Sequence, residues 1–340
     1  MVAKQNSLAS GQRHWAEIVK PFAHSDVRRS VWQIANTLIP YVALWVLMYY
    51  SLRISYWLTL ALAVPTAGFM VRLFIQFHDA GHGSFFPSRK ANDLWGVITG
   101  VLTYTPYYHW RHTHAVHHAS AGNLDKRGVG DVVTYTVDEW LAMPPLQRFG
   151  YRLYRNPFVL LGLGSLYTFL IGNRFYRGEV SERSCNSIVT TNFFIFLMVL
   201  TLVMVMGLRN FLLIQLPIAW LGGIFGVWMF YVQHQFDGVY WERQEDWDYL
   251  TAALDGSSYY KLPKLLQWFT GNIGIHHVHH LNPRIPNYNL QACVEADPIF
   301  QVEPLTLASS LRCLKFRLYD ETNSKLVGFR EIKARTRALA

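Results

Sequence analysis

Long runs of apolar residues are the strongest feature of the hydrophobic pattern along this chain. Two runs follow each other near the N-terminus and two more lie past the middle, at residues 31–52, 54–77, 188–208 and 211–233. Each has about the twenty residues that a helix needs to cross the hydrocarbon core of a bilayer. The connections within the pairs are short, around Arg53 in the first and at Arg209 and Asn210 in the second. The pattern therefore predicts four membrane-spanning helices arranged as two hairpins.

Two further apolar runs are too short to be predicted as spans. Residues 94–107 and 158–172 are expected to be re-entrant or interfacial segments, because a crossing helix needs a longer run. Arg72 is the only charged residue in the second long run. It lies near the end of that run, and we expect it to snorkel to the membrane interface.

The runs divide the chain into three parts. We expect a cytosolic N-terminal segment at residues 1–30, one domain at 31–314 and a cytosolic tail at 315–340. Within the domain, residues 78–187 and 234–314 are expected to form a helical cap outside the membrane. The predicted fold is an all-α integral membrane protein, with four transmembrane helices in two hairpins and a cytosolic cap.

Composition and charge support this assignment and indicate an orientation. Of the 340 residues, 51% are hydrophobic and only 16% are charged, below the roughly 25% usual for soluble proteins. The polar segment before the first span carries basic residues and lacks the apolar core of a secretory signal, which favours a cytoplasmic N-terminus. The net charge of +9 is not gathered into a nucleic-acid motif, so we expect membrane lipid and no nucleic acid as a partner. The three scattered cysteines are expected to be reduced thiols.

Histidines are concentrated in three short clusters that follow the spans or lie between them. Eight of the 14 histidines fit one HxxxH template and two HxxHH templates. They are His78 and His82, then His114, His117 and His118, and finally His276, His279 and His280. Positions i, i+3 and i+4 share one face of a helix, so each cluster is expected to present its histidines on one side.

Eight imidazoles of this kind indicate a site for two metal ions. Neutral imidazole suits iron, zinc, copper and nickel, and eight ligands exceed the four that one tetrahedral zinc accepts. Two histidines four positions apart are separated by about 6 Å along a helix axis, so we expect such a pair to give one ligand to each ion. The clusters can meet only if both cap segments lie on the same side of the membrane. Four spans and an internal N-terminus satisfy this condition, whereas a fifth crossing at residues 158–172 does not.

At these clusters the sequence resembles the membrane-bound fatty acid desaturase family, and more closely its acyl-lipid, methyl-end branch of the Δ12/ω6 type. The resemblance covers about residues 31–290 and rests on three boxes that are highly specific together. They are HDAGH at 78–82, HAVHH at 114–118 after Trp110 and Arg111, and HHVHH at 276–280 before LNPRIPNY at 281–288. The third box begins with His276 where front-end desaturases have glutamine, which argues against that branch.

The resemblance implies a di-iron centre that activates O₂ and removes two hydrogens from unactivated methylenes of an acyl chain. Its implied ligands are the eight template histidines and a ninth, His234, because YVQH at 231–234 resembles the family's motif for a further ligand. His234 also follows the last span as His78 follows the second. The electrons come from ferredoxin or cytochrome b5 in related enzymes. Since the sequence lacks an HPGG-type cytochrome b5 motif, a separate donor protein is expected. The site and both termini are expected to face the cytoplasm.

The remaining histidines and several carboxylates and tryptophans have lesser expected roles. His109, His112 and His277 are off the templates and are expected to be structural or to support the ligands, whereas His14 and His24 are expected at the surface. Candidate hydrogen-bond acceptors for the ligand imidazoles are Asp79, Asp125, Asp131, Asp237 and Asp255. Candidates for lining an acyl tunnel are Trp110, Trp140, Trp228, Trp241 and Trp268, although tryptophans near membrane ends are more often interface anchors.

Two other functions fit parts of this pattern. A hydroxylase or ketolase on the same di-iron scaffold has the same boxes, since small changes in substrate position at the iron decide the outcome. A membrane metal carrier that passes ions between histidines belongs to a different class. It is disfavoured because transport residues belong near the bilayer midplane, and the four predicted spans contain no histidine. The pattern leaves the double-bond position, the acyl carrier and the oligomeric state open.

Overall fold

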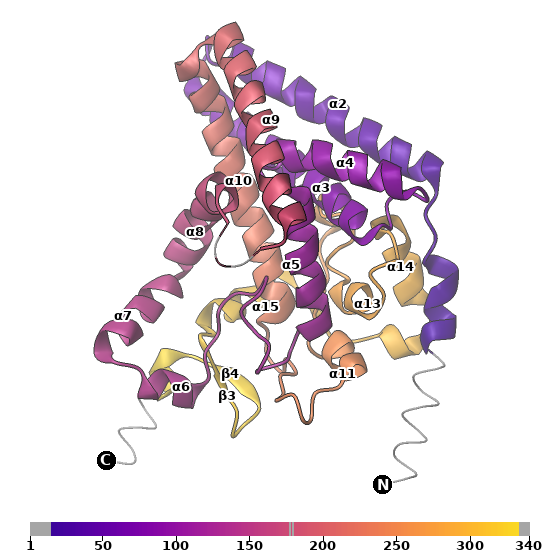
Figure 1. The fold of residues 1–340 in the computed structure, drawn as a ribbon, viewed down its shortest axis with the longest axis vertical. Helices are drawn as coiled ribbons and strands as arrows, with labels where there is room; N and C mark the ends of the chain where they lie inside the picture. Colours follow the sequence, from indigo (N-terminus) through magenta and orange to yellow (C-terminus); the bar gives the residue numbers. More distant parts are fainter. Residues whose placement is uncertain (1–14, 177, 179, 333–340) are drawn as a thin grey trace.

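The computed structural model describes residues 15–176, 178 and 180–332, so His14 and the two ends of the chain lie outside the described residues. Its longest helices are α2 Val27–Ser51, α3 Tyr56–His82, α9 Glu182–Met206 and α10 Leu208–His234. All four are long and apolar enough to cross a bilayer, as the hydrophobic runs predicted. Figure 1 shows them in the upper part of the molecule, with α4 between α2 and α3 and most of the other shorter elements below. The chain is a mostly helical integral membrane protein with four candidate spans.

The long helices differ from the predicted runs at their ends. α3 continues through the first histidine box and ends at Gly83, whose φ of 70° lies in the left-handed region that glycine adopts readily. The break between α9 and α10 falls at Gly207, with a φ of 83°, and not at Arg209 and Asn210, which lie in the first turn of α10. The predicted position of the second turn was therefore wrong. Hydropathy marks where the apolar run stops, whereas the helix ends where the backbone can turn.

Arg72 is buried and does not snorkel to the membrane interface. Its Nε donates to Thr37 Oγ1 on α2 at 3.1 Å, and a terminal nitrogen donates to the carbonyl oxygen of Trp268. The guanidinium also lies 4.0 Å from the centre of the Trp268 ring. The sequence-based expectation was wrong because α12, Lys264–Phe269, packs over this end of α3, and α12 and α2 together supply the partners that water would otherwise provide.

The shorter elements form a cap at the end of the spans where α3 and α10 carry their histidines. Its helices are α4 Arg89–Leu102, α5 Tyr107–Ser120, α6 Val137–Ala142, α7 Pro145–Tyr154, α8 Gly164–Leu166, α11 Tyr249–Leu254, α12, α13 His276–Leu281, α14 Asn287–Ala296 and α15 Leu307–Ser310. α8 lies between two π-helical stretches, Phe158–Leu163 and Tyr167–Ile171. The run expected at 94–107 is α4 followed by a short connection, and the run expected at 158–172 is this interrupted helix.

Two small sheets complete the cap. β1 Tyr259–Tyr260 pairs in parallel with β2 Pro304–Leu305, and β3 Leu318–Asp320 pairs antiparallel with β4 Lys325–Val327. In the second sheet, Leu318 and Val327 are buried in one apolar cluster with Trp140 and Tyr151. The part of the expected C-terminal tail that the structure describes is therefore packed against α6 and α7.

The core of the cap also contains the cap-proximal ends of two spans. Ile75 of α3 and Val232 of α10 are buried in one cluster with Ile275 and Val278. Ile275 precedes α13, and Val278 lies within it. All six residues of α13 are buried. The third histidine cluster is thus held in the interior, directly against the ends of the helices that carry the first cluster and His234.

Candidate metal centre

All nine predicted ligands come together where the ends of α3 and α10 meet α5 and α13. Their ring nitrogens form two groups, and the nitrogens of each group lie within 4.8 Å of one another. The five-histidine group contains His78, His82, His114, His118 and His279. The four-histidine group contains His117, His234, His276 and His280. Each group is able to hold a metal ion, and two groups agree with the expected count of two metal positions.

The division of each helix between the two groups differs from the expectation. Histidines four positions apart, such as His114 and His118, lie in the same group, while the intervening His117 lies in the other. α13 repeats the pattern, because His276 and His280 lie in the four-histidine group and His279 lies in the five-histidine group. Positions i and i+4 point about 40° apart around a helix, whereas i+3 points about 60° away from i on the other side. The side chains at i and i+4 therefore point to nearly the same side, and their ring nitrogens meet although their backbones are separated along the helix axis.

The spacing of the nitrogens fits metal binding. Nε2 atoms are 3.2 Å apart in His114 and His118 and 3.0 Å apart in His276 and His280. Two nitrogens bound to one ion at about 2.1 Å and at right angles are separated by about 3.0 Å. The Nε2 atoms of His78 and His82 are buried and have no hydrogen-bond partner among the described residues. Leaving such atoms unpaired is costly, so the arrangement calls for a cation between the rings.

Burial keeps five ligand imidazoles of the cap neutral. It holds the pKa of five of these histidines well below the usual 6.5, and neighbouring histidines lower the pKa further, in His114, His118, His276, His279 and His280. A histidine with a lowered pKa remains unprotonated at neutral pH, so its lone pair is available to a metal. Eight of the nine side chains are buried, and only His82 is half-buried.

Three rings are oriented by acceptors at their other nitrogen. His78 Nδ1 lies 3.2 Å from Asp79 Oδ1, and His117 Nδ1 lies 2.5 Å from Asp131 Oδ1. His234 Nδ1 lies 3.3 Å from the carbonyl oxygen of Gly256. Such contacts fix the ring and its tautomer so that Nε2 faces the group.

Two of the five candidate carboxylates therefore contact a ligand imidazole, Asp79 and Asp131. Asp125 instead pairs with Arg243 at 2.7 Å. Asp237 and Asp255 belong to neither metal-binding group in the part of the chain that the structure describes.

The Asp79 carboxylate is itself held by residues that the sequence did not indicate. Its Oδ2 accepts from the backbone nitrogen and from Nδ2 of Asn287, at 2.7 and 2.8 Å. Asn287 is in turn paired through its side-chain amide with Gln33 of α2. Asn287 lies within the segment after the third box, but no spacing rule links it to an aspartate 208 residues earlier.

The off-template histidines lie outside both groups. His112 is exposed and His109 is half-buried on α5, and His24 is exposed. His277 is fully buried with its Nε2 2.9 Å from the carbonyl oxygen of Phe300, so it ties α13 to the 298–300 turn. These positions agree with the structural roles that the templates predicted.

A largely apolar cavity of about 740 Å³ leads to the histidines. It runs between α3, α5, α10 and the π-helical segment, and His78, His114 and His276 line it. The first two belong to the five-histidine group and the third to the four-histidine group. A molecule in the cavity thus passes beside both groups, and the volume is within the usual range for ligand sites.

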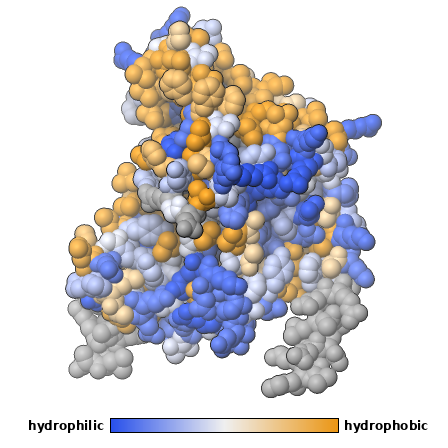
Figure 2. All heavy atoms as spheres, viewed as in Figure 1, coloured by the Kyte–Doolittle hydropathy of each residue, from blue (hydrophilic) through white to orange (hydrophobic). Residues whose placement is uncertain are grey.

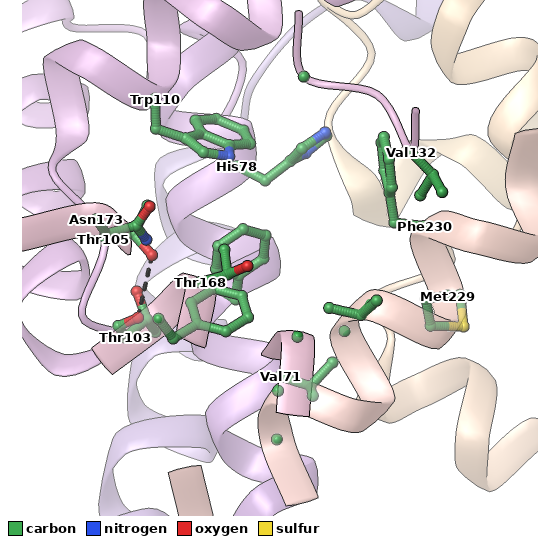
Figure 3. A pocket seen from close by; sticks show the side chains of 18 of the residues that line it. Val71, His78, Thr103, Thr105, Trp110, Val132, Thr168, Asn173, Met229 and Phe230 are labelled. Carbon is green, nitrogen blue, oxygen red and sulfur yellow. Dashed lines mark hydrogen bonds between the residues drawn. The ribbon is translucent and has the colours of Figure 1, made fainter. Parts of the chain in front are cut away.

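Among the tryptophan candidates only Trp110 lines this cavity. Its indole stacks on the His114 ring with 4.2 Å between the ring centres. Figure 3 shows Trp110 beside His78 on one side, with Val132 and Phe230 across the open space. The other four pack elsewhere, such as Trp241 against Tyr319 and Trp268 under Arg72. Three polar residues, Thr103, Thr105 and Asn173, gather at a separate part of the wall.

Comparison with known proteins identifies a family whose match covers the histidines of this site. The family model described as fatty acid desaturase matches residues 54–300, which include all three histidine boxes and His234. A fatty acid desaturase from Bacillus subtilis is 47% identical over 330 residues, covering 97% of this chain and 94% of that protein.

More distant relatives carry more specific names. An sn-1 oleoyl-lipid 12-desaturase from Synechocystis is 27% identical over 260 residues, covering 74% of this chain and 70% of that protein. An sn-1 acyl-lipid omega-3 desaturase (ferredoxin) from Nostoc is also 27% identical, over 282 residues, covering 75% of this chain and 73% of that protein.

Proposed function

This chain belongs to the fatty acid desaturase family, and from that premise we propose that it is a di-iron acyl-lipid desaturase that inserts a cis double bond. The enzyme is an oxidoreductase of that family. The observation that carries the proposal is the apolar cavity, because its wall includes histidines of both groups. We propose a Δ12/ω6-like position, supported by the HDAGH, HAVHH and HHVHH boxes and by the 12-desaturases among the relatives.

The nine histidines are proposed to hold one iron in the five-histidine group and one in the four-histidine group. Bound iron would supply O₂ activation and an oxidant for unactivated methylenes. The protein supplies neutral nitrogen donors, and Asp79 and Asp131 orient His78 and His117. The burial of eight of the nine rings excludes water, which protects a strong oxidant from side reactions.

The walls of the cavity position the substrate. Val71 and Phe74 of α3 line the cavity together with Val227 and Phe230 of α10, so the space accepts a hydrocarbon chain. The Asp131 carboxylate, which also belongs to the wall, is paired with His117. Trp110 is held against His114 and narrows the cavity beside the five-histidine group. A methylene in this part of the cavity is oriented by contact alone, and its place along the wall decides which hydrogens are removed.

Electrons are proposed to come from a separate protein, a ferredoxin or a cytochrome b5. Among the relatives, the Nostoc omega-3 desaturase carries ferredoxin in its name. Its sequence identity to this chain makes a ferredoxin the first donor to test.

Product analysis tests the proposed reaction. Expression in a host that lacks polyunsaturated lipids is expected to produce new dienoic acyl chains, with the added double bond located by mass spectrometry of derivatised lipids. The matched control is His118→Ala, which removes one histidine of the five-histidine group. Hydroxylated or keto products would instead identify the enzyme as a hydroxylase or ketolase, and an unchanged lipid profile would contradict the proposal.

We propose that the spans form two hairpins with the cap and both termini in the cytoplasm. Arg53 lies in the connection between α2 and α3, and Arg209 lies in the first turn of α10. Both are exposed at the end of the spans away from the cap. Lys126 and Glu245 are exposed in the cap, whereas the nearby Arg127 and Arg243 form ion pairs and are less suitable for substitution.

Single cysteines at Arg53 and Arg209 are expected to react with an impermeant thiol reagent only from outside the cell. Cysteines at Lys126 and Glu245 are expected to react only after the membrane is opened. The physical reason is that all three clusters must share one compartment to share one site. Labelling of Lys126 and Glu245 from opposite sides would contradict the four-span arrangement.

A further inference from the structure

A band of exposed apolar side chains extends from the spans along one side of the cap. On α7, Leu146, Phe149 and Leu153 follow the spacing of one helix face and are exposed, Leu146 to 80%. The interrupted helix after α7 continues the band with Phe158, Leu163, Tyr167 and Ile171, of which Phe158 is 88% exposed. Figure 2 shows hydrophobic residues continuing from the long helices down the left edge to the region of α7 in Figure 1. We call these seven residues the apolar band.

The band coincides with an opening of the substrate cavity. Leu163, Tyr167 and Thr168 line the cavity and are at the same time exposed on the outer surface. Exposed residues of the wall mark where the cavity meets its surroundings. Gly130 is also exposed, but Leu163 and Tyr167 belong to the apolar band. The cavity that passes both histidine groups therefore opens beside the π-helical segment, among apolar side chains.

We propose that the apolar band lies in the bilayer and that an acyl chain reaches the cavity sideways from the surrounding lipid, through the opening at Leu163 and Tyr167. This inference rests on the proposed function for the identity of the substrate. It adds the route by which the acyl chain reaches the cavity without leaving the bilayer.

Three observations indicate that the apolar band contacts membrane lipid. It is continuous with the spanning helices, which also expose many apolar side chains. The helix after α7 is too short to cross, so it is suited to the boundary between headgroups and acyl chains. The other side of α7 carries Arg148 and Arg152, whose guanidiniums lie over the Trp140 ring. Such an arrangement of apolar and basic faces fits a helix lying on an anionic leaflet.

The π-helical turns also suit the position. Wide i to i+5 turns are uncommon and are often found at functional sites. Here they flank Gly164 on both sides and form the part of the wall between the cavity and the band. The rim is thus built from backbone that deviates from a regular helix at the place where a substrate must pass.

Spin-label depth measurements test the location of the band. The full chain carries Cys185→Ser, since the other two cysteines are buried, and is reconstituted in vesicles of phosphatidylcholine and phosphatidylglycerol. Labels at Phe149 and Leu163 are expected to collide with O₂ more than with a water-soluble nickel complex. A label at Gln147, exposed on the polar side of α7, is expected to show the reverse. Nickel-favoured collisions at Phe149 would overturn the proposal. So would spin–spin broadening that unlabelled protein removes, because a second copy would then cover the band.

Crosslinking tests the route without requiring turnover. A phosphatidylcholine with a diazirine on its acyl chain is expected to label peptides of α10 that line the cavity. Leu163→Arg should reduce this labelling about tenfold or more, because an arginine is costly in a hydrocarbon environment. Leu163→Ala and Leu146→Arg, the second of which lies on the band but away from the opening, should label as the parent does. Equal labelling in Leu163→Arg would overturn the route. A protein that is labelled but forms no double bond would contradict the proposed function instead.

Discussion

His234→Ala is expected to abolish desaturation and to release one of two bound irons. His234 lies at the end of α10, and its Nε2 is 3.1 Å from that of His117 and 3.0 Å from that of His276. Removing it leaves three imidazoles in a group of four, while the five-histidine group keeps all its members. We expect activity to fall on the order of 100-fold or more, since even loss of a residue that only supports a ligand costs 10–100-fold.

His112→Ala is the matched control. This histidine lies in the same cap, two residues from His114, but it is exposed and outside both groups. It is expected to keep both irons and nearly the parent rate. The measurements are iron per chain by elemental analysis and product formation with a reducing system, on protein purified in the same detergent.

A third variant separates the two groups. His82→Ala removes a member of the five-histidine group, so it should lose the other iron and keep the one that His234→Ala releases. The spectrum of the remaining iron should therefore differ between the two variants. Full iron content in His234→Ala, or iron loss in His112→Ala, would show that the nine-histidine assignment is wrong.

The spans and the histidine sets could be predicted because both depend on local patterns. A run of twenty apolar residues reads as a crossing helix wherever the rest of the chain lies. The helical spacing of His114, His117 and His118 places them on one side of α5 in any fold. The identity of the residues that come together was therefore accessible from the sequence. Their role as metal ligands stays a prediction.

The allocation of histidines between the two groups was not accessible from the spacing. Whether His117 joins His114 or His234 depends on where α10 and α13 lie against α5. That placement is fixed by packing between segments more than 100 residues apart, as in the His117 to His234 contact. The axial rise along one helix says nothing about a second helix, and the expectation that relied on it was wrong.

The partners of buried charged residues could not be predicted from the sequence either. Arg72 was expected at the interface because an unpartnered cation seeks water. In the structure Thr37 and the Trp268 carbonyl satisfy it, and both come from distant segments. Asn287 holds Asp79 by the same kind of long-range contact. Sequence patterns identify which residues need partners, and only the folded chain provides them.

Arg155→Ala is expected to destabilise the cap more than any other change outside the metal centre. Arg155 is 1% exposed at the end of α7 and donates to five acceptors. They are the carbonyl oxygens of Val133 and Phe316, the hydroxyls of Thr134 and Tyr231, and Gln235 Oε1. Because these groups belong to separate segments, one guanidinium links α7, α10, the C-terminal segment and the loop that follows Asp131.

Truncation removes the Arg155 donor from all five buried acceptors, of which Val133 O keeps the Tyr151 hydroxyl and Phe316 O keeps the Tyr231 hydroxyl as donors. Each such loss costs about 1–3 kcal/mol, so we expect a decrease in the free energy of unfolding on the order of 3 kcal/mol or more. Gln235 adjoins His234, and Val133 lies two residues after Asp131, so retention of iron should fall as well. Arg155→Lys should recover only part of the stability, since an ammonium cannot reach the same acceptors in one plane.

Arg152→Ala provides the comparison on the same helix. Its side chain is exposed and contacts the Trp140 ring with 5.0 Å to the ring centre, an interaction worth about 0.5–1 kcal/mol at such a site. Thermal unfolding in mild detergent, followed by circular dichroism, should therefore show a large decrease in Tm for Arg155→Ala and a small one for Arg152→Ala. Equal shifts in the two variants would mean that burial and five acceptors add nothing to the role of Arg155. The cap would then be held by its apolar core alone.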